Sequence, residues 1–289
     1  MTSFFQRFIP KSMRSNAVTI PVIRLHGTIM SGGGQFRQPL SLASAAGVIE
    51  KAFSFKDAPA VAISVNSPGG SPVQSRLIYR RIRDLAKEKD KTVLVFVEDV
   101  AASGGYMIAL AGDEIIADPS SIVGSIGVVS AGFGFTELLE KIGVERRLHA
   151  AGRNKATLDP FSPEKPEDVE HLKALQLEVH QTFIDLVKDR RANRLANTDD
   201  LFTGLFWSGI SGKALGLVDH LGDMRSFLKT RYGEKTQLRL VSPQRGFFGR
   251  RMGLFGSASG AAADDIAARA VHGLADAAMD RALWARYGL

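Results

Sequence analysis

Short apolar runs alternate with longer amphipathic stretches along this chain. Four runs rich in valine and isoleucine have the length and composition of buried strands: Val18–Leu25, Ala60–Val65, Val93–Val97 and Glu114–Ala117. Helical patterns separate several of them. This alternation predicts an α/β fold, in which helices cover a mostly parallel sheet.

The best marked helix begins at Pro72. Ser71 suits the N-cap, proline suits the first helical position, and Gln74 stands where a capping box places a glutamine. We expect this helix to run to about Asp90. Further helices are predicted to start near Tyr106 and to span Thr136–Ile142 and Pro166–Ala196, the last with one apolar face made of Leu172, Leu175, Val179, Phe183, Leu186 and Val187.

The composition changes after about Gly233. The stretch Gly246–Gly256 mixes glycine, phenylalanine and arginine, and Asp264–Tyr287 has a helical pattern. We therefore predict three parts: a basic amphipathic segment at 1–16, a main domain at 17–232 and a C-terminal extension at 233–289.

Composition excludes several kinds of protein. A chain of 289 residues with 45% hydrophobic content can bury a sizeable core. It has no cysteine, which excludes a disulfide framework and cysteine-ligated metals, and its six histidines lack the HExxH spacing of zinc hydrolases. We expect no metal and no cofactor. The net charge of +7 suits anionic lipid or nucleic acid, but solubility also explains it, and we expect no nucleic-acid partner.

No apolar run approaches the roughly 20 residues of a membrane-spanning helix, and the N-terminus lacks the pattern of a signal peptide. We interpret the chain as cytoplasmic. Met1–Arg14 sets apolar residues among basic ones. This segment suits peripheral contact with an anionic membrane, at the inner face of the cell membrane, or it is a frayed tail.

Ser103 and Lys155 are the candidates for chemistry. Ser103 lies in Val100–Met107, between an apolar strand and a helix start, where backbone N–H groups and the helix dipole favour negative charge. Lys155 follows in Gly152–Ala156 and offers a base. By spacing alone, the alternative stays open that these glycines only let a helix approach its neighbours.

Other motifs fail. Gly209–Lys213 is followed by Ala214, so it lacks the Ser/Thr of a phosphate-binding loop, and Gly132–Gly134 lacks the third glycine of a dinucleotide fingerprint. Ala101 stands at the first glycine of the G-x-S-x-G elbow, which disfavours an α/β-hydrolase.

Five motifs in order resemble the signal-peptide peptidase A, or protease IV, family in its short, single-repeat form. They are Ser67–Gly70, Ala102–Tyr106, Gly124–Val128, Lys155 with Asp159–Pro163, and Gly216–Gly222. The resemblance covers about Val18 to Lys229. It implies a Clp protease/crotonase-like fold, a serine endopeptidase with a Ser/Lys dyad, and a homo-oligomer.

The resemblance also implies roles for single residues. Ser103 matches the nucleophile, Lys155 the general base and Ser125 the hydroxyl that orients the lysine. The N–H of Gly70 matches one half of an oxyanion hole, and the N–H of Ser103 or Gly104 would complete it. A lysine accepts a proton only when neutral, and its reference pKa is about 10.4, so such a site has to lower it. Nearby, Arg153 would favour the neutral form and Asp159 would oppose it.

Substrates are expected to be extended peptides with small or apolar side chains, such as cleaved signal peptides or other membrane-proximal peptides. They would add as a strand beside Ile126–Val129, in contact with Gly69, Ile126, Gly127 and Val128. Two other functions stay open. One is a crotonase-like acyl-CoA enzyme, and the other is a non-catalytic scaffold at a membrane surface.

Overall fold

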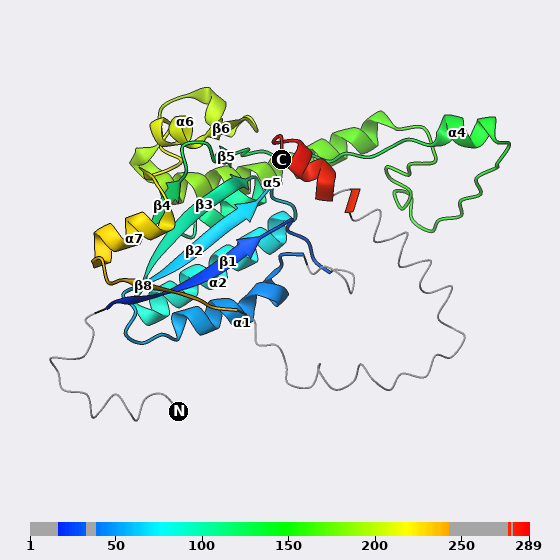
Figure 1. Cartoon of the computed structure of the whole chain (residues 1–289). Helices are drawn as coiled ribbons and strands as arrows, with labels where there is room; N and C mark the ends of the chain where they lie inside the picture. The colour runs from blue at the N-terminus through cyan, green and yellow to red at the C-terminus, as the bar shows by residue number, and fades with distance from the viewer. Residues whose placement is uncertain (1–16, 33–38, 243–276, 279) are drawn as a thin grey trace, which may run out of the picture.

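A single sheet forms the centre of the protein in its computed structural model, which describes residues 17–32, 39–242, 277–278 and 280–289 (Figure 1). The strands follow the order β6-β5-β3-β2-β1-β8, and β4 joins β3 and β7. Every pair is parallel except β5 with β6. The strands are β1 Thr19–His26, β2 Ala60–Ser67, β3 Thr92–Ala102, β4 Glu114–Ala117, β5 Ile122–Gly124, β6 Phe206–Ser208, β7 His220–Leu221 and β8 Gln237–Leu240.

All four predicted strands are present. The third is longer than expected: β3 continues past Val97 because Val100 and Ala102 pair with β5. A register shift between Val65 and Ser67 of β2 accompanies this extension. The longer strand carries the chain directly to Ser103.

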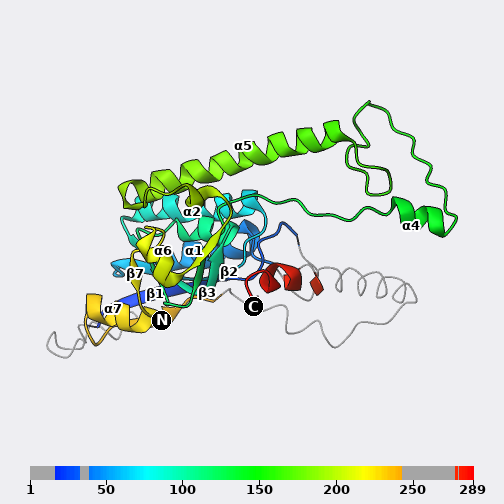
Figure 2. The same cartoon turned by 90° about the horizontal axis from the view of Figure 1, so that it is seen from above.

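Helices cover both faces of the sheet (Figure 2). One hydrophobic cluster joins the sheet to α1 (Leu42–Phe53), α2 (Pro72–Lys89) and α5 (Pro166–Arg191). A second cluster joins the other face to α7 (Met224–Tyr232) through Leu228. The shorter helices are α3 Gly104–Ala109, α4 Thr136–Lys141 and α6 Gly209–Ala214, with 3₁₀ turns at Ala192–Arg194 and Asp199–Phe202.

The helix predicted from Pro72 is confirmed, and its cap is partly as expected. The Ser71 side chain accepts a hydrogen bond from the Gln74 N–H, as an N-cap serine does. The Gln74 side chain instead accepts from the Leu42 N–H at 3.0 Å. It therefore joins the starts of α2 and α1 rather than closing a capping box.

The prediction for the long helix needs correction. It ends at Arg191 rather than Ala196, and of its expected apolar face only Phe183 and Val187 are buried. Leu175 remains 46% exposed. The physical reason is position: the first turns of α5, like α4, lie beyond the end of the sheet in both views (Figures 1 and 2).

The folded unit extends past residue 232, where the sequence placed the end of the main domain. Strand β8 pairs with β1 over Gln237–Leu240, and Val241 is buried. The basic segment 1–16 and the stretch Gly246–Gly256 lie outside the described residues, so their predicted membrane contact stays a prediction.

Candidate active site

Ser103 lies at the junction of β3 and α3 in a backbone conformation that serine rarely adopts. Its φ is 50° and its ψ is −121°, a conformation that costs roughly 1–3 kcal/mol and persists only where the surrounding structure holds it. The Ser103 N–H donates to the Gly124 carbonyl at 2.8 Å. Its hydroxyl makes no capping bond to α3. The strand, the helix and this bond therefore fix the backbone while the hydroxyl stays available.

The loop Gly69–Gly70 packs directly on the serine. A Cβ atom at Gly69 would lie 2.9 Å from three atoms: Ala102 O, Gly104 N and Ser103 Cβ. The φ of Gly69 is also +106°, which disfavours any side chain. Only glycine permits this approach of the loop to Ser103.

Gly70 and Gly104 place their amides near each other. The Gly70 nitrogen is 3.4 Å from the position that a Cβ at Gly104 would take. Gly104 is the first residue of α3, so its N–H has no acceptor within the helix. The bonds that hold the loop use its neighbours, since Ile29 N donates to Gly69 O and Ser71 N donates to Ile29 O. The Gly70 N–H takes no part in them.

This arrangement corrects one expectation for the oxyanion hole. The sequence left Ser103 or Gly104 as the second donor beside Gly70. Because the Ser103 N–H is already donated to Gly124 O, the amide that fits the role is that of Gly104.

Ser125 lines the same cavity from the end of β5, the strand that pairs with β3. It also has a positive φ, of 53°, and is only 2% exposed. Its N–H donates to Leu205 O at 2.8 Å, and its Oγ accepts a hydrogen bond from the Tyr287 hydroxyl at 3.2 Å. The cavity has a volume of about 500 Å³, and the expected site residues in its lining are Gly70, Ser103, Gly104, Ser125, Gly127 and Val128.

The segment expected to bind peptide leads out of this cavity. Gly127 and Val128 line it, whereas Ile126 is buried and Gly69 packs against Ser103 without lining the cavity. Residues 126–131 belong to no strand. Their backbone therefore has no sheet partner among the described residues.

His180 was missed by the sequence reading as a site residue. It lines the cavity from α5, and its Nε2 lies 3.0 Å from the Ile126 carbonyl oxygen. The sequence offered no partner at ligand spacing because His180 and Ile126 are 54 residues apart. Tyr287 and Thr203 line the cavity too, and no local motif marks them.

Lys155 does not line the Ser103 cavity of its own chain. It is exposed, and its backbone N–H donates to Gly152 O in a turn. The segment between β5 and α5, which includes it, extends away from the sheet with α4 in both views (Figures 1 and 2). The structure thus brings together the expected nucleophile, oxyanion donors and orienting serine, and leaves the expected base apart.

The carboxylate expected to oppose a neutral lysine is paired elsewhere. Arg146 donates two hydrogen bonds to Asp159, each of 3.0 Å. These bonds hold the pKa of the Asp159 carboxyl below its usual range, with help from the N–H of Phe161 and the hydroxyl of Ser162.

Ionisable side chains are few around Ser103. Among the described residues that line the cavity, the only ones are His180, Arg286 and Tyr287. No cluster of three or more potential metal ligands occurs in the described part of the chain.

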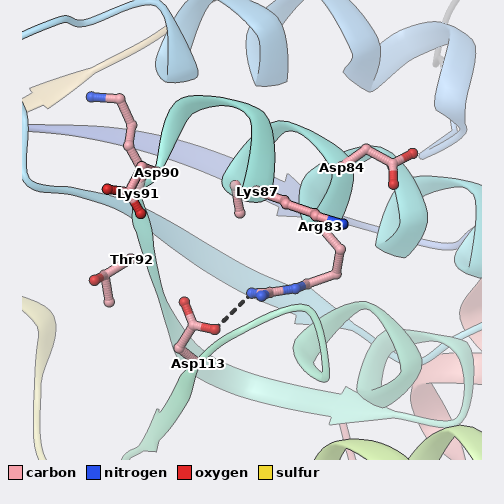
Figure 3. Close-up of a pocket in the computed structure, with 8 residues that line it drawn as sticks. Arg83, Asp84, Lys87, Asp90, Lys91, Thr92 and Asp113 are labelled. Atoms are coloured by element: carbon pink, nitrogen blue, oxygen red, sulfur yellow. Dashed lines mark hydrogen bonds and ion pairs between the residues drawn. The ribbon is translucent and has the colours of Figure 1, made fainter.

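A second cavity lies at the opposite end of β3, beside Thr92 and the end of α2 (Figure 3). Its charged side chains connect parts of the fold: Arg83 of α2 pairs with Asp113 at 2.7 Å and also donates a hydrogen bond to Ala111 O. None of the residues expected to carry chemistry lines it.

The comparison with known families agrees with the geometry around Ser103. The model of peptidase family S49 matches residues 85–237, more than half of the chain. The chain belongs to peptidase family S49. This confirms the resemblance drawn from the five motifs, and the α/β architecture with its mostly parallel sheet is the expected Clp protease/crotonase-like fold.

Several relatives of this S49 member cover most of the chain. The Na(+)/H(+) antiporter NhaA of Brucella abortus is 65% identical over 290 residues, which are 100% of this chain and 39% of that protein. The chloroplastic serine protease SPPA of Arabidopsis thaliana is 34% identical over 209 residues, 71% of this chain and 31% of that protein. Protease 4 of Salmonella typhi is 34% identical over 215 residues, 71% of this chain and 33% of that protein.

The chain spans less than half the length of each of these relatives. Within the residues that the structure describes, no helix has the length and apolar character needed to cross a bilayer.

Proposed function

We propose that this S49 member is a serine endopeptidase in which Ser103 attacks the peptide bond and Lys155 of a neighbouring copy acts as the base. The observation that carries the proposal is the strained Ser103 at the start of α3, with the Gly70 and Gly104 amides beside it. The proposal concerns peptidase chemistry only, since the Brucella protein named as an antiporter is matched over 39% of its length.

The reaction would proceed by acyl transfer. The Ser103 oxygen bonds to the carbonyl carbon of the peptide while its proton passes to the lysine nitrogen. The carbonyl oxygen becomes an oxyanion and accepts hydrogen bonds from Gly70 and Gly104. When the C–N bond breaks, the amine leaves with the proton from the lysine, and the acyl group stays on Ser103. The lysine then takes a proton from water while the water oxygen attacks the ester carbon. It returns that proton to the Ser103 oxygen as the acyl C–O bond breaks and the acid product leaves.

The position of Lys155 supports a base from another copy. The cavity itself offers no lysine or carboxylate that could act as the base: no lysine, aspartate or glutamate is found among the described residues that line the Ser103 cavity. The segment with Lys155 points away from the sheet (Figure 2). A second copy would bring this segment to Ser103, with Ser125 orienting the neutral amine of the lysine.

Exposed apolar side chains on this segment and on α5 favour such an assembly. Phe133 is 82% exposed, Ile142 is 60% exposed and Leu177 of α5 is 67% exposed. Exposed apolar side chains mark interaction surfaces in soluble proteins where they lie together. A homo-oligomer would bury them, and a head-to-tail contact would give every copy one Ser103 and one lysine from its neighbour.

Mixing two inactive variants tests the arrangement. Ser103→Ala and Lys155→Ala should each abolish peptide hydrolysis, and subunits mixed one to one should recover about a quarter of the parental rate if the pairing is between copies. Lys51→Ala, an exposed lysine at the end of α1, is the control and should keep the parental rate. Each mixture is assayed after subunit exchange, with its mass measured in solution.

The possible outcomes separate the parts of the proposal. A mixture that stays inactive, with both single variants inactive, would place the dyad within one chain. Single variants that both hydrolyse peptides at the parental rate would contradict the Ser/Lys mechanism itself. Mapping of a fluorophosphonate label to Ser103 by mass spectrometry tests the nucleophile independently of the base.

A further inference from the structure

Helix α3 begins directly after Ser103 and is too short to hold itself in place. All of its residues, Gly104–Ala109, are buried, and an isolated helix of this length is unstable in water. Ser103 keeps its strained φ of 50° only while α3 stays where it is. A rotation or a slide of the helix would let this residue relax, so contacts with other elements have to fix α3.

Close packing fixes α3 in one direction. A Cβ atom at Gly105 would lie 2.3 Å from Ser67 O, and a Cβ atom at Gly104 would lie 2.4 Å from Ser75 Oγ. These contacts prevent α3 from moving toward β2 and α2. They do not prevent a rotation or a movement away, because packing of this kind only repels.

Two arginines hold the C-terminal end of α3. Arg190 of α5 donates to Leu110 O and to Gly112 O, both at 2.9 Å. Arg83 of α2 donates to Ala111 O at 3.0 Å. Cations at this end also favour the helix dipole. Bonds to the end of a helix oppose a slide along its axis, but they leave rotation about that axis to be opposed elsewhere.

Tyr106 joins the first turn of α3 to a distant part of the chain. It follows Ser103 by about one helical turn, its exposed fraction is 0%, and its hydroxyl donates to Leu217 O at 2.8 Å. Burial raises the pKa of this hydroxyl, so it remains a neutral donor at neutral pH. Because the bond leaves the side of the helix, it opposes rotation. Leu217 belongs to the motif Gly216–Gly222, which contributes no residue to the lining of the Ser103 cavity.

The acceptor of the Tyr106 bond is itself fixed. The Leu217 N–H donates to Gly212 O at 2.8 Å. The guanidinium of Arg191, a residue that is only 2% exposed, donates to Gly216 O and to both carboxylate oxygens of Asp219. The turn that receives the tyrosine hydroxyl is therefore attached on both sides of Leu217.

We propose that Tyr106 is a positioning residue for the nucleophile. Its hydroxyl ties α3 to Leu217 and so holds the Ser103 oxygen and the Gly104 N–H where both can act on one carbonyl group. The inference rests on the proposed function, because it assigns the attack to Ser103 and an oxyanion bond to Gly104. Tyr106 does not line the cavity. It acts through the backbone of α3 and leaves the binding of peptide to other residues.

Tyr106→Phe removes the hydroxyl and keeps the ring. We expect kcat for peptide hydrolysis and the rate of Ser103 labelling by a fluorophosphonate each to fall about tenfold, with KM unchanged, because a displaced nucleophile slows the chemical step. Tyr79→Phe is the matched control. Tyr79 is a half-buried tyrosine of α2 that packs against the same hydrophobic cluster as Tyr106, and its variant should keep the parental rates.

A variant destabilised elsewhere separates positioning from a general loss of stability. Lys91 precedes β3, at the end opposite to Ser103, and its ammonium group donates to Phe55 O and Ala58 O. Lys91→Met should lower the urea midpoint and keep the parental kcat. Equal losses of kcat in Lys91→Met and Tyr106→Phe would overturn the proposal, and so would a parental kcat in Tyr106→Phe.

Hydrogen exchange reports the anchor without catalysis. The amides of Met107 and Leu110, which are bonded to Ser103 O and Tyr106 O, should exchange about fivefold faster in Tyr106→Phe, because opening of α3 no longer breaks the bond to Leu217. Tyr79→Phe should leave their exchange unchanged. Parental exchange in Tyr106→Phe would overturn the anchor, even where Ser103 reacts. Faster exchange in Tyr106→Phe, with no labelling of Ser103 in the parent, would show that the anchor stands and that the proposed peptidase function fails.

Discussion

Arg146 donates two parallel hydrogen bonds to Asp159, both 3.0 Å long, on the segment that carries Lys155. The Arg146 guanidinium also lies over the Phe161 ring at 4.9 Å, and Phe161 stacks on Phe135 with ring centroids 5.5 Å apart. These contacts connect residues 159–161 to Phe135, which precedes α4. The shape of the segment that would reach a neighbouring copy therefore depends on one exposed cluster.

Arg146→Ala should lower the rate of peptide hydrolysis about tenfold, because a less ordered segment delivers the lysine less often. Arg147→Ala is the matched control, since Arg147 is 75% exposed and pairs only with Glu145 in the described residues. The rate is measured at saturating peptide, with the mass in solution checked for both variants. Equal losses in the two variants would contradict a special role for the Arg146 cluster.

The pH dependence of this pair follows from the carboxyl. Since the Arg146 hydrogen bonds lower the Asp159 pKa, the pair persists above the ordinary carboxyl pKa of about 3.9 and is lost as pH falls through the lower value. Asp159 therefore stays ionised between pH 5 and 7. The pH dependence of peptide hydrolysis in that range should have the same midpoint in the parent and in Arg146→Ala. A difference in that midpoint would show that Asp159 titrates in this range.

Gly69→Ala should reduce hydrolysis at least tenfold without unfolding the protein. The new Cβ would lie 2.9 Å from Ser103 Cβ and from Gly104 N, so the loop has to shift, and Gly70 shifts with it. Removal of one oxyanion donor costs about a hundredfold or more in kcat, so displacement of the proposed donor should be measurable. Gly47→Ala, at an α1 position with nothing within 4 Å, is the control. Activity and circular dichroism are measured together, and parental activity in Gly69→Ala would contradict the oxyanion assignment.

His180→Ala should weaken peptide binding more than it slows the chemical step. His180 lies 3.0 Å from Ile126 O and positions the backbone that leads to Gly127 and Val128. Loss of one such bond corresponds to about a fivefold rise in KM. His171→Ala, an exposed histidine of the same helix, should leave KM unchanged. A fall in kcat with constant KM would instead indicate that His180 takes part in catalysis.

Asp219→Asn should destabilise the fold by about 3–5 kcal/mol, because it leaves Arg191 as an uncompensated buried charge. Arg191 is 2% exposed, donates to both Asp219 oxygens at 2.8 and 3.0 Å, and also donates to Gly216 O. Glu234→Gln breaks an exposed pair with Lys229 and should cost about 0–1 kcal/mol. Urea unfolding at neutral pH measures both, and equal midpoints would contradict this ranking.

The same carboxylate should contribute to acid unfolding. Burial alone would raise the Asp219 pKa, but hydrogen bonds from Arg191 and the Ile115 N–H, with the Arg191 charge, bring it below its usual value. Stability from the pair is therefore present above about pH 4 and lost as pH falls further. The dependence of the unfolding free energy on pH below 4 should be shallower in Asp219→Asn than in the parent.

Local patterns predicted the strands and the nucleophile well. Val18–Leu25 and Ala60–Val65 were found as strands because parallel strands buried on both faces appear as continuous apolar runs. Ser71 and Pro72 marked their helix because capping acts over neighbouring residues. The buried face of α5 was predicted wrongly because its burial depends on distant residues. The apolar period predicts which side chains share a face, but not whether another part of the chain packs against Leu175.

The sequence by itself determined the α/β class, the glycines that surround Ser103 and the membership of the peptidase family, since these depend on residues close together in the chain. Only the tertiary structure decided three features. The Ser103 N–H donates to the Gly124 carbonyl, Tyr287 donates to Ser125 although the two are 162 residues apart in the chain, and Lys155 lies apart from the cavity. The physical reason is that backbone conformation is set locally, whereas long-range pairing depends on the packing free energy of the whole chain.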